Sequence, residues 1–158
     1  MIHIQYGQQG RFYVTTEEKR IDTGVPSSKI RYLFKFTNNM SKSVVYGYGQ
    51  SQAVNDRYTL VAINHGTNNV YTGTVNFTPN GYWTYEIYEV SWQGSVSLGA
   101  GEAPINENDV LTPVSANKGV VQGSVEKGKL LVSETAGSEE VQYTEHPEPS
   151  GTNYIYVS

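Results

Sequence analysis

The chain contains no cysteine, so neither a disulfide framework nor a thiolate metal site is available to it. Charged residues are also sparse, at 16% of 158 residues, and the net charge of −4 comes with no cluster of lysine and arginine. Because nucleic-acid binding needs a basic surface, this composition disfavours a nucleic-acid partner. Stability must come from the core, from hydrogen bonds or from association with other subunits.

Long apolar runs are missing as well. None approaches the roughly 20 residues of a membrane-spanning helix, so we expect no membrane partner. The N-terminal sequence MIHIQYGQQG has neither a basic start nor an uninterrupted apolar stretch, and we expect no secretory signal in it. No stretch of useful length has the period of an amphipathic helix. Without a helical pattern, the chain is expected to form β-structure.

The abundant residues fit that expectation. Tyrosine occurs 13 times and glycine 16 times, in a chain whose hydrophobic content is only 37%. Tyrosine can bury its ring and keep its hydroxyl wet, so it suits strands with one solvated side. A length of 158 residues predicts one domain, which we place at residues 1–145.

The clearest strand signal lies in the run VYTGTVNFTPNGYWTYEIYEVS, residues 70–91. In an extended chain Tyr71, Val75 and Phe77 share one face. The residues after Thr78–Gly81 alternate in the same way. The sequence allows two local topologies here: a simple hairpin, or the corner of an immunoglobulin-like sandwich, in which Tyr82 or Tyr85 bonds back to the corner.

Further alternating runs extend the strand list. A long surface loop is expected at residues 95–118, followed by a hairpin that turns at Glu126–Gly128. Residues 146–158 follow as an extended C-terminal arm. The other expected strands are Ile2–Tyr6, Arg11–Thr16, Ile30–Thr37, Ser43–Tyr48, Arg57–Asn64, Val120–Ser124, Lys129–Glu134 and the edge strand Val141–Thr144. Seven to nine short strands predict an all-β, immunoglobulin-like, two-sheet antiparallel β-sandwich with extended terminal segments.

Groups that could carry catalysis do not converge in the sequence. The histidines His3, His65 and His146 stand alone, without the several ligands that a metal site needs. Glu86 and Glu89 are three residues apart on a strand, so they face opposite sides and cannot act as an acid–base pair. We therefore expect no enzyme activity, no metal and no cofactor.

Two further motifs also have plainer explanations. The run Gly123–Leu130 has the glycine and lysine spacing of a phosphate loop, but leucine replaces the hydroxyl residue and no helix follows. The acidic stretch Glu102–Asp109 lacks the alternating acidic positions and the central glycine of an EF-hand loop. The first run is interpreted as part of a β-rich segment, and the second as a solvated acidic loop.

Protein contact is the better-supported role for the remaining aromatic and apolar residues. Exposed aromatic patches commonly mark contacts with proteins or sugars. The alternative is that several of these aromatics cover the second sheet. Strands at sheet edges and terminal arms can add to a neighbour. The candidate contact residues are Ile2, Ile4, Tyr6, Trp92, Tyr154, Ile155 and Tyr156.

Three segments carry a resemblance to a known group of proteins. They are RYLFKFTN at residues 31–38, VYTG at 70–73 and GYWTYEIYEVSW at 81–92. With these segments the chain resembles short β-sandwich virion proteins of tailed bacteriophages, in particular the auxiliary capsid proteins of crAss-like phages. Those proteins have YLFEFTN, YTG and YxYxVYE strands in this order. Lys35, Trp83 and Ile87 depart from the pattern, and the likeness fades after about residue 94.

The resemblance implies a structural role without catalysis, on an immunoglobulin-like fold. We expect an auxiliary or decoration protein on the capsid surface of a virion, synthesised in the host cytoplasm. Its partners would be the major capsid protein and other virion proteins, and self-association stays open. Two alternatives remain: a tail or neck component of the same virion, and a carbohydrate-binding or adhesion module that stacks glycans on exposed tyrosines and Trp92.

Overall fold

The computed structural model describes residues 1–54 and 57–134, and their regular secondary structure is almost entirely β, as predicted. Two short 3-10 helices, η1 (Glu17–Lys19) and η2 (Ser27–Lys29), lie between the second and third strands. The strands are β1 (Ile2–Gln5), β2 (Gln9–Val14), β3 (Ile30–Asn38), β4 (Val44–Tyr48), β5 (Gln50–Val54), β6 (Thr59–His65), β7 (Thr74–Val75), β8 (Gly81–Ser91) and β9 (Val120–Ser133).

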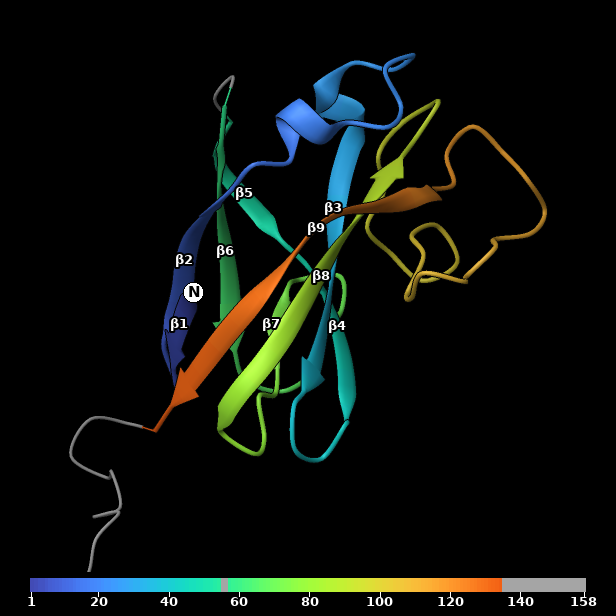
Figure 1. The fold of residues 1–158 in the computed structure, drawn as a ribbon. Coiled ribbons are helices and arrows are strands. Elements are labelled where there is room, and N and C mark those ends of the chain that lie inside the picture. Colours follow the sequence, from blue (N-terminus) through green and yellow to red (C-terminus); the bar gives the residue numbers. More distant parts are fainter. Residues whose placement is uncertain (55–56, 135–158) are drawn as a thin grey trace, which may run out of the picture.

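The strands form two layers (Figure 1). One sheet has the order β1-β9-β8-β3-β4, and the other has the order β2-β6-β5 with β7 beside β6. If β2 is taken as strand B, these are the G-F-C-C′ and B-E-D orders of an immunoglobulin sandwich, with β1 added beside G. The expectation of purely antiparallel sheets is wrong, because β1 pairs with β9 and β6 pairs with β7 in parallel.

The main core fills the space between the sheets. Alternation predicts that Phe34 and Phe36 of β3 point the same way, and both are fully buried there. The ring of Phe77 makes edge contacts with Phe36 at 4.9 Å and with Trp83 at 5.5 Å between centroids. These edge-to-face packings add to the apolar area that the rings bury.

The segment at residues 70–91 is a crossing between sheets and not a hairpin. β7 is only two residues long and pairs with β6, whereas β8 lies in the five-stranded sheet. Trp83 Nε1 donates a hydrogen bond to the Pro79 carbonyl, at 3.0 Å. The residue that bonds back to this corner is therefore Trp83, and neither of the candidates Tyr82 and Tyr85. Tyr82 is 57% exposed, and Tyr85 is buried.

The last described strand also differs from the prediction. β9 is one continuous strand of 14 residues, where a hairpin turning at Glu126–Gly128 was expected. It pairs with β8 along its length and takes up two register shifts, near Gly123, whose φ is 153°. Bulges bend a strand without ending it. The glycine of the expected turn, Gly128, pairs with Tyr85 of β8 inside the ladder, where a Cβ would collide with the tyrosine side chain. The expected strand Val141–Thr144 and the 146–158 arm lie outside the described residues.

Candidate protein-contact surface

The segment between β8 and β9, residues 92–119, packs against the outer face of the five-stranded sheet. No helix or strand lies between Ser91 and Val120, in agreement with the expected loop. The segment, which we call the β8–β9 loop, begins with Trp92, and this indole is fully buried. It belongs to a second core cluster with Leu33 of β3, Tyr48 of β4 and Ala103 of the loop. The five-stranded sheet is therefore buried on both faces in this region.

Hydrogen bonds fix the loop to the sheet and to itself. The Tyr48 hydroxyl donates to the Pro104 carbonyl at 2.5 Å, and the Gly119 amide donates to the Glu102 carbonyl at 2.9 Å. A Cβ on Gly119 would lie 2.6 Å from the Trp92 ring, closer than van der Waals contact allows. Position 119, the last residue of the loop before β9, therefore requires a glycine, because any side chain there would collide with the Trp92 ring.

Glu107 joins the loop to two neighbouring strands. Its carboxylate accepts from the Lys35 ammonium of β3 at 2.6 Å and from the Tyr46 hydroxyl of β4 at 2.5 Å. Burial by itself raises the pKa of Glu107, but the hydrogen bonds from Lys35 and Tyr46 outweigh it and leave the pKa below 4.5. Burial and the same carboxylate raise the pKa of the Tyr46 hydroxyl. Glu107 is therefore held as a carboxylate that clamps the loop.

Replacing Glu107 with glutamine is expected to lower the free energy of unfolding by about 1–2 kcal/mol at neutral pH, because two charge-assisted hydrogen bonds are weakened. The folded-state pKa lies below the unfolded value of about 4.5, so this stabilisation is present above that pH. It is lost as pH falls through the folded pKa. Urea denaturation of both proteins at several pH values measures the difference.

The control for this prediction is Lys127→Gln. Lys127 pairs with Glu86 at 3.2 Å, but its side chain is 69% exposed, so its loss should cost less than about 0.5 kcal/mol. An equal cost for the two variants, or a cost of Glu107→Gln that does not begin to decrease as the pH falls below about 4.5, would contradict this role of Glu107.

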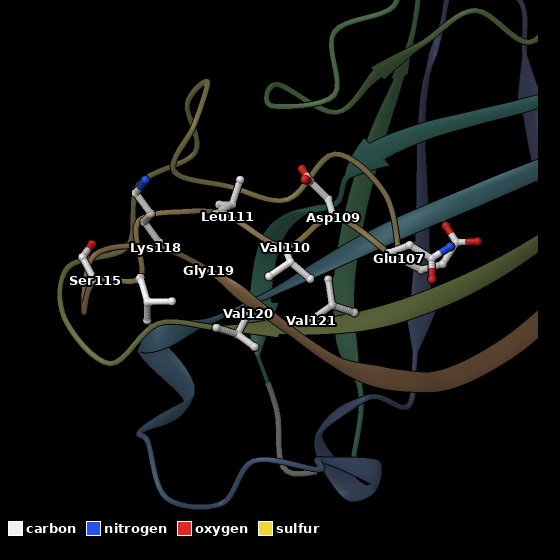
Figure 2. Close-up of a pocket in the computed structure, with 11 residues that line it drawn as sticks. Glu107, Asp109, Val110, Leu111, Ser115, Lys118, Gly119, Val120 and Val121 are labelled. Atoms are coloured by element: carbon white, nitrogen blue, oxygen red, sulfur yellow. The ribbon is translucent and has the colours of Figure 1, made fainter.

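A hollow opens where the β8–β9 loop meets the start of β9. Its volume is about 480 Å³. In Figure 2, Val110 of the loop lies opposite Val120 and Val121 of β9. The complete lining is Glu107, Asn108, Asp109, Val110, Leu111, Val114, Ser115, Lys118, Gly119, Val120 and Val121. We call this set the valine hollow.

The valine hollow exposes aliphatic side chains to an unusual degree. Val114 is 84% exposed, Val110 is 79% exposed and Val120 is 54% exposed. An apolar patch of this kind with polar residues at its border is typical of a protein-contact site. The side chains of Asp109 and Lys118 supply the border charges (Figure 2). The site is suited to recognise apolar side chains by shape.

Two other surfaces expose large side chains. At the end of the five-stranded sheet away from the loop, Met1, Met40 and Tyr82 border a shallow hollow of about 930 Å³. On the four-stranded sheet, the rings of Tyr13 and Tyr58 pack edge to face at 5.0 Å and are 66% and 43% exposed. Within residues 1–54 and 57–134, no group of three or more histidine, aspartate or glutamate side chains could hold a metal ion.

The structure gives the predicted contact residues different positions. Ile2 and Ile4 face the main core, because strand alternation turns both inward. Their side chains are therefore not a contact surface. The expectation that Trp92 is exposed is also wrong, because its indole is buried beneath the β8–β9 loop in the second core cluster. Tyr6 is half-buried, and its hydroxyl donates to the Phe77 carbonyl at 2.7 Å. The candidates Tyr154, Ile155 and Tyr156 lie outside the described residues.

The valine hollow was not among the sequence candidates. One signal could have indicated it: Val110, Leu111 and Val114 lie close together within residues 106–119, which are otherwise mostly polar. Apolar residues in a loop usually either fill the core or form a contact. Sequence alone does not separate these two outcomes.

Comparison with known proteins adds no family: no family model, no curated protein and no solved structure matches the chain. The part of the chain that the structure describes also contains no helix long and apolar enough to cross a bilayer.

Proposed function

We propose that this protein is a structural virion protein of a tailed bacteriophage, an auxiliary capsid protein that decorates and stabilises the shell. The observation that carries the proposal is the valine hollow, an exposed aliphatic surface formed by the β8–β9 loop and the first residues of β9. A subunit that binds a shell needs such a surface, and the aliphatic centre would meet apolar side chains of a neighbouring virion subunit.

The resemblance supports the virion setting through the framework of the fold. Its segments at residues 31–38 and 81–92 form β3 and β8, which are neighbours at the centre of the five-stranded sheet. The part of the β8–β9 loop that lines the hollow begins at Glu107, after the resemblance has faded. In this proposal the strands that carry the resemblance, β3 and β8, stabilise the fold, and the β8–β9 loop determines which partner is bound. A neck or tail position would use the same surface.

Cryo-electron microscopy of the parent particle tests this proposal directly, since position and copy number separate head, neck and tail. Particles assembled with the double variant Val110→Asp, Val114→Asp should hold the protein at about tenfold lower occupancy or less, because two charges would be buried against apolar side chains. Deletion of Ser150–Ser158 should also lower the occupancy.

The matched control is Met40→Asp, which changes a 91% exposed apolar residue away from the valine hollow. It should leave occupancy unchanged. Full occupancy of the double variant would overturn the role of the hollow, and absence of the protein from purified particles would overturn the virion assignment.

A carbohydrate-binding module is the second candidate, and the Tyr13–Tyr58 pair favours it. Exposed tyrosine rings on a sheet can stack on sugar rings, as in many glycan sites. A glycan array in which the chain binds and Tyr13→Ala does not would support this function. An array without hits would remove it.

A further inference from the structure

We propose that the valine hollow receives the C-terminal residues Tyr154–Val157 of a second copy of this chain. The inference deepens the proposed assembly role and rests on it for its biological setting. It names a partner for the hollow, so that neighbouring copies would be joined by their own C-terminal segments.

The chemistry of the segment matches that of the hollow. From Ser150 to Ser158 the sequence has no charged side chain, and its apolar residues are the consecutive run Tyr154–Val157. In an extended segment Ile155 and Val157 point to one side. The hollow offers aliphatic side chains to such a face, and Val110 and Val120 are more than half exposed.

The main chain beside the hollow is also available for pairing. β1 pairs only with Leu130–Ser133, the last part of β9. On that side of Val120–Gln122, no strand among the described residues is paired with β9, whose other side pairs with β8. An unpaired strand edge is a template for an added strand, and pockets beside the edge select its side chains. Edge and hollow together fit an extended apolar segment.

The direction of β9 favours a second copy as the donor. The hollow lies at the first residues of β9, whereas the described chain ends at Glu134, directly after its last residue. The 14 residues of β9 separate these two points, which lie at opposite ends of the strand (Figure 1). A segment returning on its own chain would meet β1 on the edge of β9. A donor at one end and an acceptor at the other produce a head-to-tail contact that can repeat from copy to copy.

Complementation of two variants in sedimentation equilibrium tests this inference on the purified protein. The wild type should associate with increasing concentration. A chain lacking Thr152–Ser158 keeps its hollow, and the double variant Val110→Asp, Val114→Asp keeps its C-terminal segment. Each alone should associate at least about tenfold more weakly, and an equimolar mixture should form a heterodimer. Met40→Asp should associate like the wild type, and unchanged thermal melting of the double variant shows that it folds.

Cysteine cross-linking identifies the donor, because the chain has no cysteine of its own. Val114→Cys and Ile155→Cys in separate chains should give a disulfide-linked dimer on mixing and oxidation. A doubly substituted chain that instead closes on itself in dilute solution would overturn the second-copy assignment. So would a wild type that stays monomeric at all concentrations, or a truncated chain that associates like the wild type. These experiments measure self-association and not occupancy on particles. A negative result would therefore overturn the second-copy inference alone, and the virion proposal would still be tested by electron microscopy of the particles.

Discussion

Replacing Trp92 with alanine is expected to lower the free energy of unfolding by about 3–5 kcal/mol, the range found for large aromatic residues in cores. The indole is fully buried between Leu33 and Tyr48 of the sheet and Ala103 of the β8–β9 loop. Removal of the indole leaves a cavity in the second core cluster. It also removes the ring against which Gly119 packs. The loop should loosen together with the fold.

Urea denaturation measures this loss, and Tyr82→Ala is the matched control. Tyr82 lies on the same strand as Ser91, the residue before Trp92, but it is 57% exposed. Its truncation should cost less than about 1 kcal/mol. Comparable costs for the two variants would show that the second core cluster adds little to stability. Hydrogen exchange of the loop amides should rise in Trp92→Ala and stay unchanged in Tyr82→Ala.

Glu89→Ala is expected to cost about 2–4 kcal/mol, because it removes a fully buried carboxylate that anchors the segment between η1 and η2. The Glu89 side chain accepts hydrogen bonds from the Asp22 amide at 2.8 Å and from the Ile21 amide at 3.2 Å. Without it these amides lose their acceptor, and a small cavity is left in the sheet. Chemical denaturation of the variant measures the cost.

Two further substitutions separate the carboxylate from general effects of the change. Glu89→Gln keeps one acceptor oxygen and the side-chain volume, so it should recover part of the loss. Glu18→Ala removes an exposed glutamate of η1 and should stay within about 0.5 kcal/mol of the wild type. If Glu89→Ala costs no more than Glu18→Ala, Glu89 does not anchor the segment.

Much of the fold could be predicted from strand alternation. The inward set Phe34, Phe36 and Trp83 follows from a period of two, which is a local property of an extended chain. The same rule separates Glu86, which pairs with Lys127, from the buried Glu89. β5 was missed, because its short segment has no pattern of its own and depends on pairing with β6. The strand expected before Thr78 is reduced to the two residues of β7, which pair with β6.

The contact surface could not be predicted as well from the sequence. Trp92 and Ile4 look like candidates for contact when they are considered one at a time, and both are core residues. The difference arises from what covers each face of a sheet. A strand pattern indicates which residues share a face, but residues far away in sequence decide whether that face is buried.

By itself the sequence determined an all-β chain without disulfides, the inward faces of its long strands and the loop before β9, because these depend on composition and neighbouring residues. Only the tertiary structure decided that β1 joins β9 in parallel, that the β8–β9 loop covers the outer face of the sheet, and that Val110 meets Val120 at an open hollow. Those features come from contacts between distant segments, whose choice depends on how all the elements pack together.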